Sequence, residues 1–322
     1  MKELYPLKLI PATRSPIWSG KRLRDEWGKI SDSDIGESWE LCVRRDAVNV
    51  IENGEFGGKL LSDLISEYGE AITGNAEFTS ENFPLLIKLI DAGDDLSVQV
   101  HPDDDYASRI ENDRGKTEMW YIVDAEPDSR IVFGLRDGIG KEELSAAIAS
   151  GNPRALGDIL NYVPVRAGEC YFIPAGLPHA IGKGILIAEI QQNCDLTYRM
   201  YDYGRLGLDG KPRELHVEKA LDVTRSFEKS EIDSIRYLRE HSECCLADCE
   251  YFCVEKLDVN GLLELAQEQK MRHILVIDGE GEILCNDKTY SLSRGESCLL
   301  PASLCKMTLS GKFTALISSA NI

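Results

Sequence analysis

The chain has 322 residues, 43% of them hydrophobic, and a formal net charge of −19 at pH 7. This length is sufficient for two ordinary domains or for one large domain with a substantial core. The negative charge argues against nucleic acid or an anionic membrane surface as a partner, because its field repels both. No apolar run approaches membrane-spanning length and the first residues lack a signal-peptide core, so we expect a cytoplasmic globular protein.

Most of the sequence consists of short strand-like segments separated by Gly, Pro and Asp turns. Apolar residues at helical spacing predict three helical interruptions, at 59–69, 141–150 and about 214–227. Gly69 and Gly151 act as stop signals for the first two. The pattern predicts a mainly β fold with helical insertions.

The stretch DLSVQVHPDD, residues 95–104, alternates apolar and polar side chains. In a strand, Ser97, Gln99 and His101 would face one way and the apolar residues between them the other. A barrel strand is buried on both faces, so its inward polar groups must be hydrogen-bonded or must coordinate a metal. Gln99 and His101 are therefore candidate metal ligands.

Two later segments supply further candidate ligands. In GKTEMWYIVDAE, Glu118 shares a face with Lys116, and in GECYFIPAGLPHAI, His179 follows a turn rich in Pro and Gly. Together with the two ligands of the preceding strand, Glu118 and His179 form a nitrogen and oxygen set without sulfur. Such a set suits Zn²⁺ with one position open to water or substrate, and Fe²⁺ or Mn²⁺ also fits it.

The segment GILIAEIQQNCDLTYRMYDYGR carries a third group of polar residues. If it stays extended, Glu189 and Arg199 share a face and line the same cavity, although a bend at residues 193–195 would change that phase. Lys116 and Arg199 would then supply the local positive charge that an anionic substrate requires in so acidic a chain. An ordinary ion pair with a neighbouring carboxylate is the alternative for each.

The ten cysteines are expected to be reduced and buried, because the first residues lack a signal-peptide core. Four of them gather in one segment, at Cys244, Cys245, Cys249 and Cys253. Their spacing matches no zinc knuckle, and the apolar residues around them indicate a strand. We therefore predict a structural role for this cluster.

An internal repeat lies within the strands. RAGECYFIPAGLPHA and RGESCLLPASLCKM both contain Gly-Glu, four residues and Pro-Ala, so that His179 in the first copy corresponds to Lys306 in the second. WYIVDAEPDSRI and HILVIDGEGEI precede the two copies in the same order, and aligning their aspartates sets Glu118 against Arg272. The repeat predicts two cupin-type jelly-roll barrels, of which the second binds no metal.

Several separate blocks resemble, in order, the type I mannose-6-phosphate isomerases in their short bacterial form. These blocks are SPIWSGKRL, FPLLIKLIDAGDDLSVQVHPDDDYA, GKTEMWYIVDAEPDSRI and YFIPAGLPHAIGKGILIAEIQQNCDLTYRMYDYGR. The resemblance extends from about Pro6 to the third helix and, more loosely, over the second barrel. It implies a zinc-dependent aldose-ketose isomerase with one Zn²⁺ per chain.

The resemblance also implies roles for individual residues. The zinc ligands would be Gln99, His101, Glu118 and His179. Arg199 resembles the active-site arginine of the family, and Lys116 resembles the lysine two positions before the glutamate ligand. Longer family members carry a histidine directly before that lysine, where this chain has Gly115. Proton transfer through such a histidine is therefore not expected here.

The expected reaction interconverts mannose 6-phosphate and fructose 6-phosphate through a cis-enediol. We expect Glu189 to act as the base and to form the catalytic set with Arg199 and Lys116. Ser97, Lys116 and Arg199 are expected to bind the small phosphosugar substrate. Two alternatives stay open: a cupin non-haem iron oxygenase, which also uses two His and one carboxylate, and a non-enzymatic sugar-binding cupin.

The predicted organisation has three parts. Residues 1–213 would form the metal-binding catalytic barrel with helical insertions, residues 214–243 a helical connector, and residues 244–322 a degenerate second barrel. The sequence predicts no particular oligomeric state.

Overall fold

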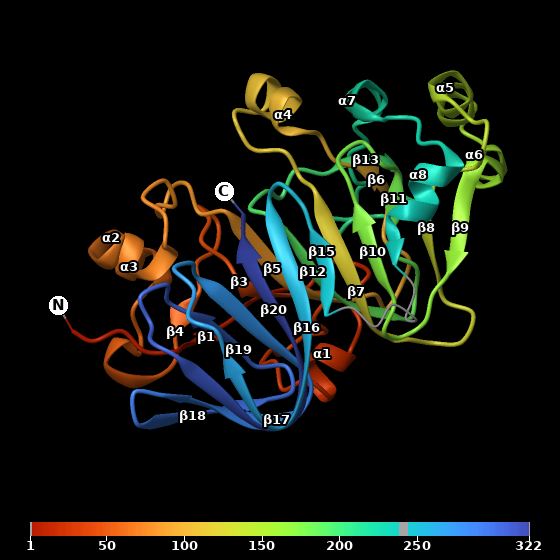
Figure 1. Cartoon of the computed structure of the whole chain (residues 1–322). Helices are drawn as coiled ribbons and strands as arrows, with labels where there is room; N and C mark the ends of the chain where they lie inside the picture. The colour runs from red at the N-terminus through yellow and green to blue at the C-terminus, as the bar shows by residue number, and fades with distance from the viewer. Residues whose placement is uncertain (1, 238–243, 322) are drawn as a thin grey trace.

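The computed structural model describes residues 2–237 and 244–321, whose strands form three antiparallel sheets (Figure 1). The seven-stranded sheet has the order β14 (Arg236–Tyr237), β10 (Cys170–Ile173), β7 (Glu118–Ala125), β12 (Ile185–Gln192), β5 (Leu85–Asp91), β3 (Glu37–Leu41) and β2 (Ala12–Arg14). The five-stranded sheet has the order β13 (Tyr198–Tyr201), β6 (Val98–Val100), β11 (His179–Ala180), β8 (Arg130–Leu135) and β9 (Leu160–Pro164). The eight-stranded sheet has the order β15 (Cys245–Asp248), β16 (Phe252–Leu265), β20 (Met307–Ala320), β17 (Arg272–Cys285), β19 (Ser297–Leu300), β1 (Leu7–Ile10) and β4 (Val50–Ile51), with β18 (Lys288–Ser293) paired to β17.

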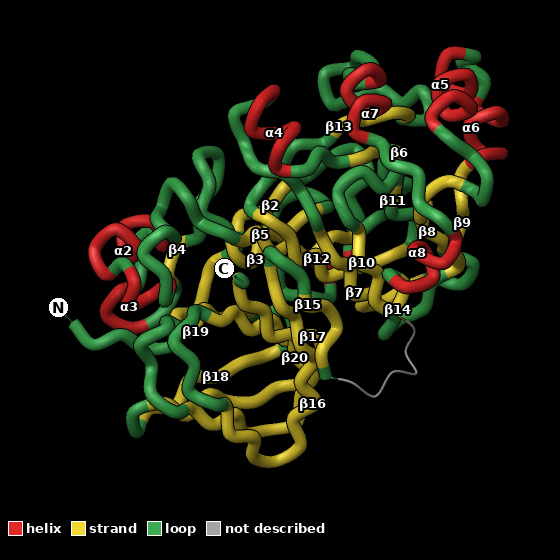
Figure 2. The backbone as a smooth tube through the Cα atoms, turned by 45° about the horizontal axis from the view of Figure 1, so that its top comes forward, coloured by secondary structure: helices red, strands yellow, loops and turns green. Residues whose placement is uncertain are grey.

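The helices are short and lie at the periphery of the strands (Figure 2). They are α1 (Arg22–Asp25), α2 (Leu61–Tyr68), α3 (Glu70–Thr73), α4 (Asp104–Ile110), α5 (Lys141–Ala149), α6 (Pro153–Ile159), α7 (Val217–Val223), α8 (Lys229–Ser234) and the 3-10 turn Gly54–Phe56. The predicted helices at 59–69 and 141–150 are confirmed by α2 and α5. The third, predicted to reach 227, ends at Val223 because the chain turns to extended backbone at Thr224. Among the described helices, none is both long and apolar enough to cross a membrane.

The seven-stranded sheet is a wall shared by two apolar cores. On one face, β5, β7 and β12 pack Leu89, Met119 and Ala188 into the core that they share with the eight-stranded sheet. On the other face, Trp120 and Ile187 pack against the five-stranded sheet. Because successive strand residues point to opposite faces, every second residue of β5, β7 and β12 is directed into the first barrel.

The predicted internal repeat is present in the backbone. Gly168 donates to the carbonyl of Ile122 at 2.8 Å, and Gly295 donates to the carbonyl of Val276 at 2.9 Å. Ile173 pairs with Glu118 in the first barrel as Leu300 pairs with Arg272 in the second. These are the positions that the sequence alignment equated. The prediction of a mainly β chain with two jelly-roll barrels and helical insertions is confirmed.

The N-terminal strand β1 belongs to the sheet of the second barrel. β1 pairs with β19, so residues 7–10 belong to the sheet of the second barrel although the sequence division places them in 1–213. Lys29 forms a second link, because its ammonium pairs with the buried Glu40 on β3 at 2.6 Å and donates to the carbonyl of Gly295 at 2.6 Å. The division at 213 and 243 remains a prediction, and residues 238–243 lie outside the described part of the chain.

The long strands of the second barrel require glycine where they pass closest to each other. Gly281 on β17 pairs with Gly311 on β20, and a Cβ at position 281 would collide with the ring of Phe313 and the carbonyl oxygen of Ser310. We predict that Gly281→Ala lowers the free energy of unfolding by about 1–3 kcal/mol, because neither neighbour can move freely. Urea denaturation followed by circular dichroism measures this loss.

The matched control is Gly157→Ala in α6, where the nearest atom to the added methyl group is 3.9 Å away. Alanine is the better helix former, so this variant should be as stable as the parent chain or more stable. Equal stability of the Gly281→Ala variant and the parent would contradict the packing of β17 on β20.

Candidate metal centre and active site

Three strands of the five-stranded sheet place one row of polar side chains side by side. His179 on β11 pairs with Gln99 on β6, and Gln99 pairs in turn with Arg199 on β13. Residues opposite each other on neighbouring strands point to the same face. The pleat therefore brings His179, Gln99 and Arg199 onto one surface, with His101 following directly after β6.

The seven-stranded sheet faces this row with acidic and basic side chains. In its register, Glu189 on β12 lies between Lys88 on β5 and Trp120 on β7, and Gln191 lies beside Glu118. All five side chains are almost completely buried. They alternate with the apolar residues of the shared core, so the polar face of the wall closes the first barrel over the histidine row.

Two imidazoles and one carboxylate converge at the centre. The Nε2 atoms of His101 and His179 are 3.1 Å apart, and the oxygens of Glu118 lie 3.6 Å from the first and 3.5 Å from the second. The Nδ1 atom of His101 is 2.7 Å from the carbonyl of Leu196, and that of His179 is 2.8 Å from the carbonyl of Leu177. Since only an N–H can donate to a carbonyl, these contacts place the protons on Nδ1. Both Nε2 atoms therefore direct lone pairs into the same space.

This arrangement fits a divalent cation. Within the described residues, His101, Glu118 and His179 are the group whose ligand atoms all lie within 4.8 Å of one another. Both carboxylate oxygens of Glu118 are buried, and one of them forms an ion pair with Lys116 at 2.8 Å. Two facing lone pairs and a carboxylate repel one another, and the single charge of Lys116 offsets only part of this repulsion. Nitrogen and oxygen ligands of this kind are those of Zn²⁺ and related metals.

Burial keeps the histidines in the form that binds metal. Desolvation lowers the pKa of His179 to about 4, and desolvation together with the neighbouring Lys116 holds the pKa of His101 well below its usual range. Both imidazoles are therefore neutral at pH 7. A metal ion binds neutral imidazole, so no proton has to be displaced from these two ligands.

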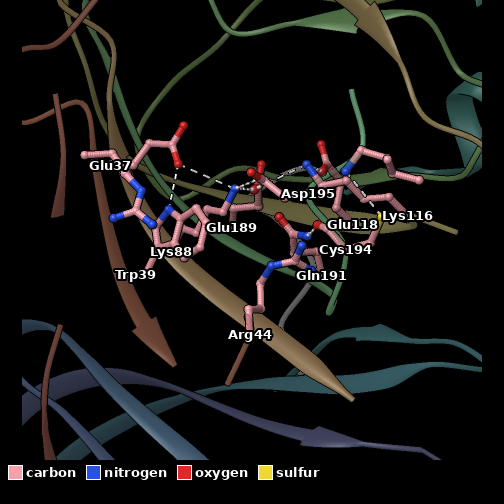
Figure 3. A network of polar contacts seen from close by, with 12 residues as sticks. Glu37, Trp39, Arg44, Lys88, Lys116, Glu118, Glu189, Gln191, Cys194 and Asp195 are labelled. Atoms are coloured by element: carbon pink, nitrogen blue, oxygen red, sulfur yellow. Dashed lines mark hydrogen bonds and ion pairs between the residues drawn. The ribbon is translucent and has the colours of Figure 1, made fainter. Parts of the chain in front are cut away.

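Two buried lysines share one carboxylate beside this group (Figure 3). Lys116 contacts Glu118 at 2.8 Å and Glu189 at 3.8 Å, and Lys88 contacts Glu189 at 3.7 Å and Asp195 at 3.1 Å. Burial alone would lower the pKa of each lysine, but the surrounding carboxylates outweigh it and raise both values. Both ammonium groups are therefore charged at neutral pH and neutralise part of the acidic cluster.

The predicted set comes together with one difference in detail. Gln99 contacts His179 through its amide nitrogen, 3.5 Å from Nε2, while its amide oxygen lies 3.5 Å from the hydroxyl of Ser97. The oxygen is the atom that coordinates metals, so Gln99 would have to rotate its amide to serve as a ligand. Arg199 donates from Nε to Ser97 at 3.2 Å, which places both residues at the edge of the site.

Lys88 was not predicted as a site residue from the sequence. It forms ion pairs with Glu37, Glu189 and Asp195. Its signal is a single lysine within the apolar run LLIKLI, where a charge must be paired because the strand is buried on both faces. The glycine directly before Lys116 also has a steric reason. A Cβ at Gly115 would lie 2.5 Å from the backbone carbon of Asp103, so no side chain fits there.

The second barrel and the cysteine cluster differ from this site. Arg272, at the position of Glu118, is buried, and Lys306, at the position of His179, is exposed and pairs with Glu264 at 2.6 Å. The clustered cysteines lie on or beside β15 and β16, and their thiols are free. In the described parts of the chain, the group that could hold an ion contains none of them, and their structural role remains a prediction.

Comparison with known proteins shows the family of the chain. Residues 7–127 match the family "Phosphomannose isomerase type I, catalytic domain", and residues 242–321 match "Mannose-6-phosphate isomerase, cupin domain". The chain is 37% identical to mannose-6-phosphate isomerase ManA of Bacillus subtilis, covering 97% of this chain and 98% of that protein. It is 36% identical to mannose-6-phosphate isomerase of Streptococcus mutans, covering 98% of each.

A solved structure extends the similarity to three dimensions. The crystal structure of mannose 6-phosphate isomerase from Bacillus subtilis superposes with a TM-score of 0.85 at 35% sequence identity, over 97% of this chain and 99% of that one. The chain therefore belongs to the type I phosphomannose isomerases, enzymes that isomerise mannose 6-phosphate.

Proposed function

We propose that the chain interconverts mannose 6-phosphate and fructose 6-phosphate through a cis-enediol and that it depends on one Zn²⁺ per chain. The observation that carries this proposal is the convergence of His101, Glu118 and His179, with both Nε2 lone pairs and a buried carboxylate directed at one point. Gln99 would complete the ligand set after rotation of its amide. When bound, the ion would act as a Lewis acid that polarises the oxygens on C1 and C2 of the sugar.

Glu189 has the features required of the base that moves the proton between C2 and C1. Its Oε2 accepts a hydrogen bond from Nε1 of Trp120 at 3.0 Å, which fixes the carboxylate plane. Its Oε1 is buried without a hydrogen-bond partner in the described chain. Desolvation and the charge of Glu118 raise the pKa of Glu189, and Lys116 and Lys88 oppose that rise. A raised pKa brings a carboxylate closer to the operating pH and strengthens it as a base.

Charged side chains at the edge of the site would bind the substrate. Arg199 and Ser97 are joined by the 3.2 Å hydrogen bond, and both lie next to Gln99 at the outer end of the histidine row. Lys116 approaches the same space from the other wall, with its ammonium 3.3 Å from Nε2 of His101. Guanidinium and ammonium groups suit a phosphorylated sugar, in particular against a net charge of −19.

The two alternatives are less well supported. A non-haem iron oxygenase would use the same two His and one carboxylate. Its chemistry would not require the buried ion pairs of Lys116 with Glu118 and Glu189. A sugar-binding cupin without activity would not require a second buried carboxylate with a raised pKa, Glu189, beside the histidines. The relatives that match over almost the full chain are isomerases.

Removal of divalent metal should abolish the conversion of mannose 6-phosphate, because the charge that develops on the enediolate requires a Lewis acid. A coupled assay that measures fructose 6-phosphate, before and after chelation and after addition of Zn²⁺, tests this. Restored turnover on adding Zn²⁺ is expected, whereas full turnover in metal-free protein would refute the metal dependence.

The metal should bind only in the first barrel. Elemental analysis of the saturated protein should give about one ion per chain, the stoichiometry of one four-ligand site. His179→Ala should lose this ion, because it removes a ligand. Lys306→Ala, the matched change at the equivalent position of the repeat, should keep both ion and turnover. Two ions per chain, or metal retained by His179→Ala, would show that the ligand assignment is wrong.

Replacing the proposed base should slow the reaction without emptying the site. Glu189→Gln keeps the shape of the side chain but cannot accept the proton, so kcat should fall by roughly 10²- to 10⁴-fold. Metal content should stay near that of the parent. Glu142→Gln, the same change on the exposed surface of α5, serves as the control. Turnover of Glu189→Gln within a few-fold of the parent would transfer the role of base to another group.

A further inference from the structure

After β13 the chain forms a hairpin that returns to Arg199. After Asp202 it runs outward, bridges between Leu206 and Pro212, and comes back at Arg213. The tip gains little from burial, because Leu206 is 56% exposed and Leu208 is 82% exposed. Apolar packing therefore does not fix the position of the hairpin, and polar contacts at its base must do so.

A single buried carboxylate holds that base together. Asp202 is 5% exposed and accepts hydrogen bonds from Nε of Arg213 at 2.7 Å and from Nη2 of the same guanidinium. It also accepts from Nη2 of Arg205 at 2.8 Å. Burial alone would raise the pKa of Asp202, but the two arginines outweigh it and lower the pKa. The carboxylate is therefore ionised and grips Arg213 in the two-pronged geometry of the strongest ion pairs.

The residues after Arg213 hold Arg199 in turn. The carbonyl of Glu214 accepts from Nη1 of Arg199 at 2.8 Å, and the backbone N–H of His216 donates to the carbonyl of Arg199 at 2.8 Å. The backbone N–H of Arg199 donates to Nδ1 of His216 at 3.3 Å. The segment 213–216 therefore clamps both the backbone and the guanidinium of Arg199.

The clamp depends on Asp202 for its position. In the described chain, the guanidinium of Arg213 donates its side-chain hydrogen bonds to Asp202. Glu214 directly follows Arg213, so the position of its carbonyl depends on that of Arg213. Without that carboxylate, Arg213 would also be an uncompensated cation near Arg199 and would repel it. Loss of Asp202 would thus release the Glu214 carbonyl and let the Arg199 guanidinium leave its place beside Ser97.

We propose that Asp202 is a positioning residue of the isomerase: through Arg213 and the carbonyl of Glu214 it fixes the orientation in which Arg199 meets the substrate. The inference rests on the proposed role of Arg199 toward the phosphosugar. Asp202 itself would not touch the substrate, and its effect on catalysis would pass through Arg199.

A double-mutant cycle on kcat/KM for mannose 6-phosphate tests this. Asp202→Asn removes the charge and keeps the shape, and in the parent background it should lower kcat/KM by about 10-fold or more. In the Arg199→Ala background the same change should have an effect of less than about 2-fold, because its target is already absent. Metal content should be the same in all four proteins, since none of these residues is a proposed ligand.

The matched control is Asp94→Asn, which removes an exposed carboxylate 3.3 Å from the same Arg205 but outside the clamp, and it should leave kcat/KM unchanged. If Asp202→Asn does not fold, Arg213→Lys keeps the charge but loses the fork, and it should show the same dependence on Arg199. Equal losses in both backgrounds would overturn the positioning role while leaving that of Arg199 intact. Normal kcat/KM in Arg199→Ala alone would instead contradict the proposed role of Arg199 toward the substrate, on which the inference rests.

Discussion

The site depends on a carboxylate that is buried where it cannot reach water. Glu118 is 0% exposed, and its neighbours are two neutral imidazoles and the ammonium of Lys116. A buried charge of this kind destabilises the fold unless positive charge lies beside it. Lys116 alone supplies part of this compensation at 2.8 Å. A divalent ion between Glu118 and the histidines would supply the rest. The same buried carboxylate therefore creates the need for a cation and provides a ligand for it.

The shared sheet explains how such a cluster fits inside an apolar protein. β5, β7 and β12 are covered on both sides, and their alternation sends apolar residues to the core between the barrels and polar residues to the site. The second barrel repeats the turn and register of the first, yet carries Arg272 and Lys306 where the first carries Glu118 and His179. It packs against the wall that positions Glu189.

Much of this could be predicted from the sequence, because alternation within one strand and repetition of one turn are local patterns. The face shared by Ser97, Gln99 and His101 and the equivalence of Glu118 with Arg272 belong to this class. Lys88 was missed because a strand buried on both faces has no polar and apolar alternation to reveal its partners. The pairing of β1 with β19 and the grip of Asp202 on Arg213 join segments whose proximity depends on the tertiary fold. No pattern of residue spacing indicates either contact.

One metal ion is expected between His101, Glu118 and His179. The most direct test is an anomalous-difference map at the zinc edge, from crystals of this chain loaded with Zn²⁺. One strong peak per chain is expected, within coordination distance of both Nε2 atoms and of a Glu118 oxygen. A map without a peak there, or with its strongest peak at the cysteines of β15 and β16 or in the second barrel, would contradict this expectation.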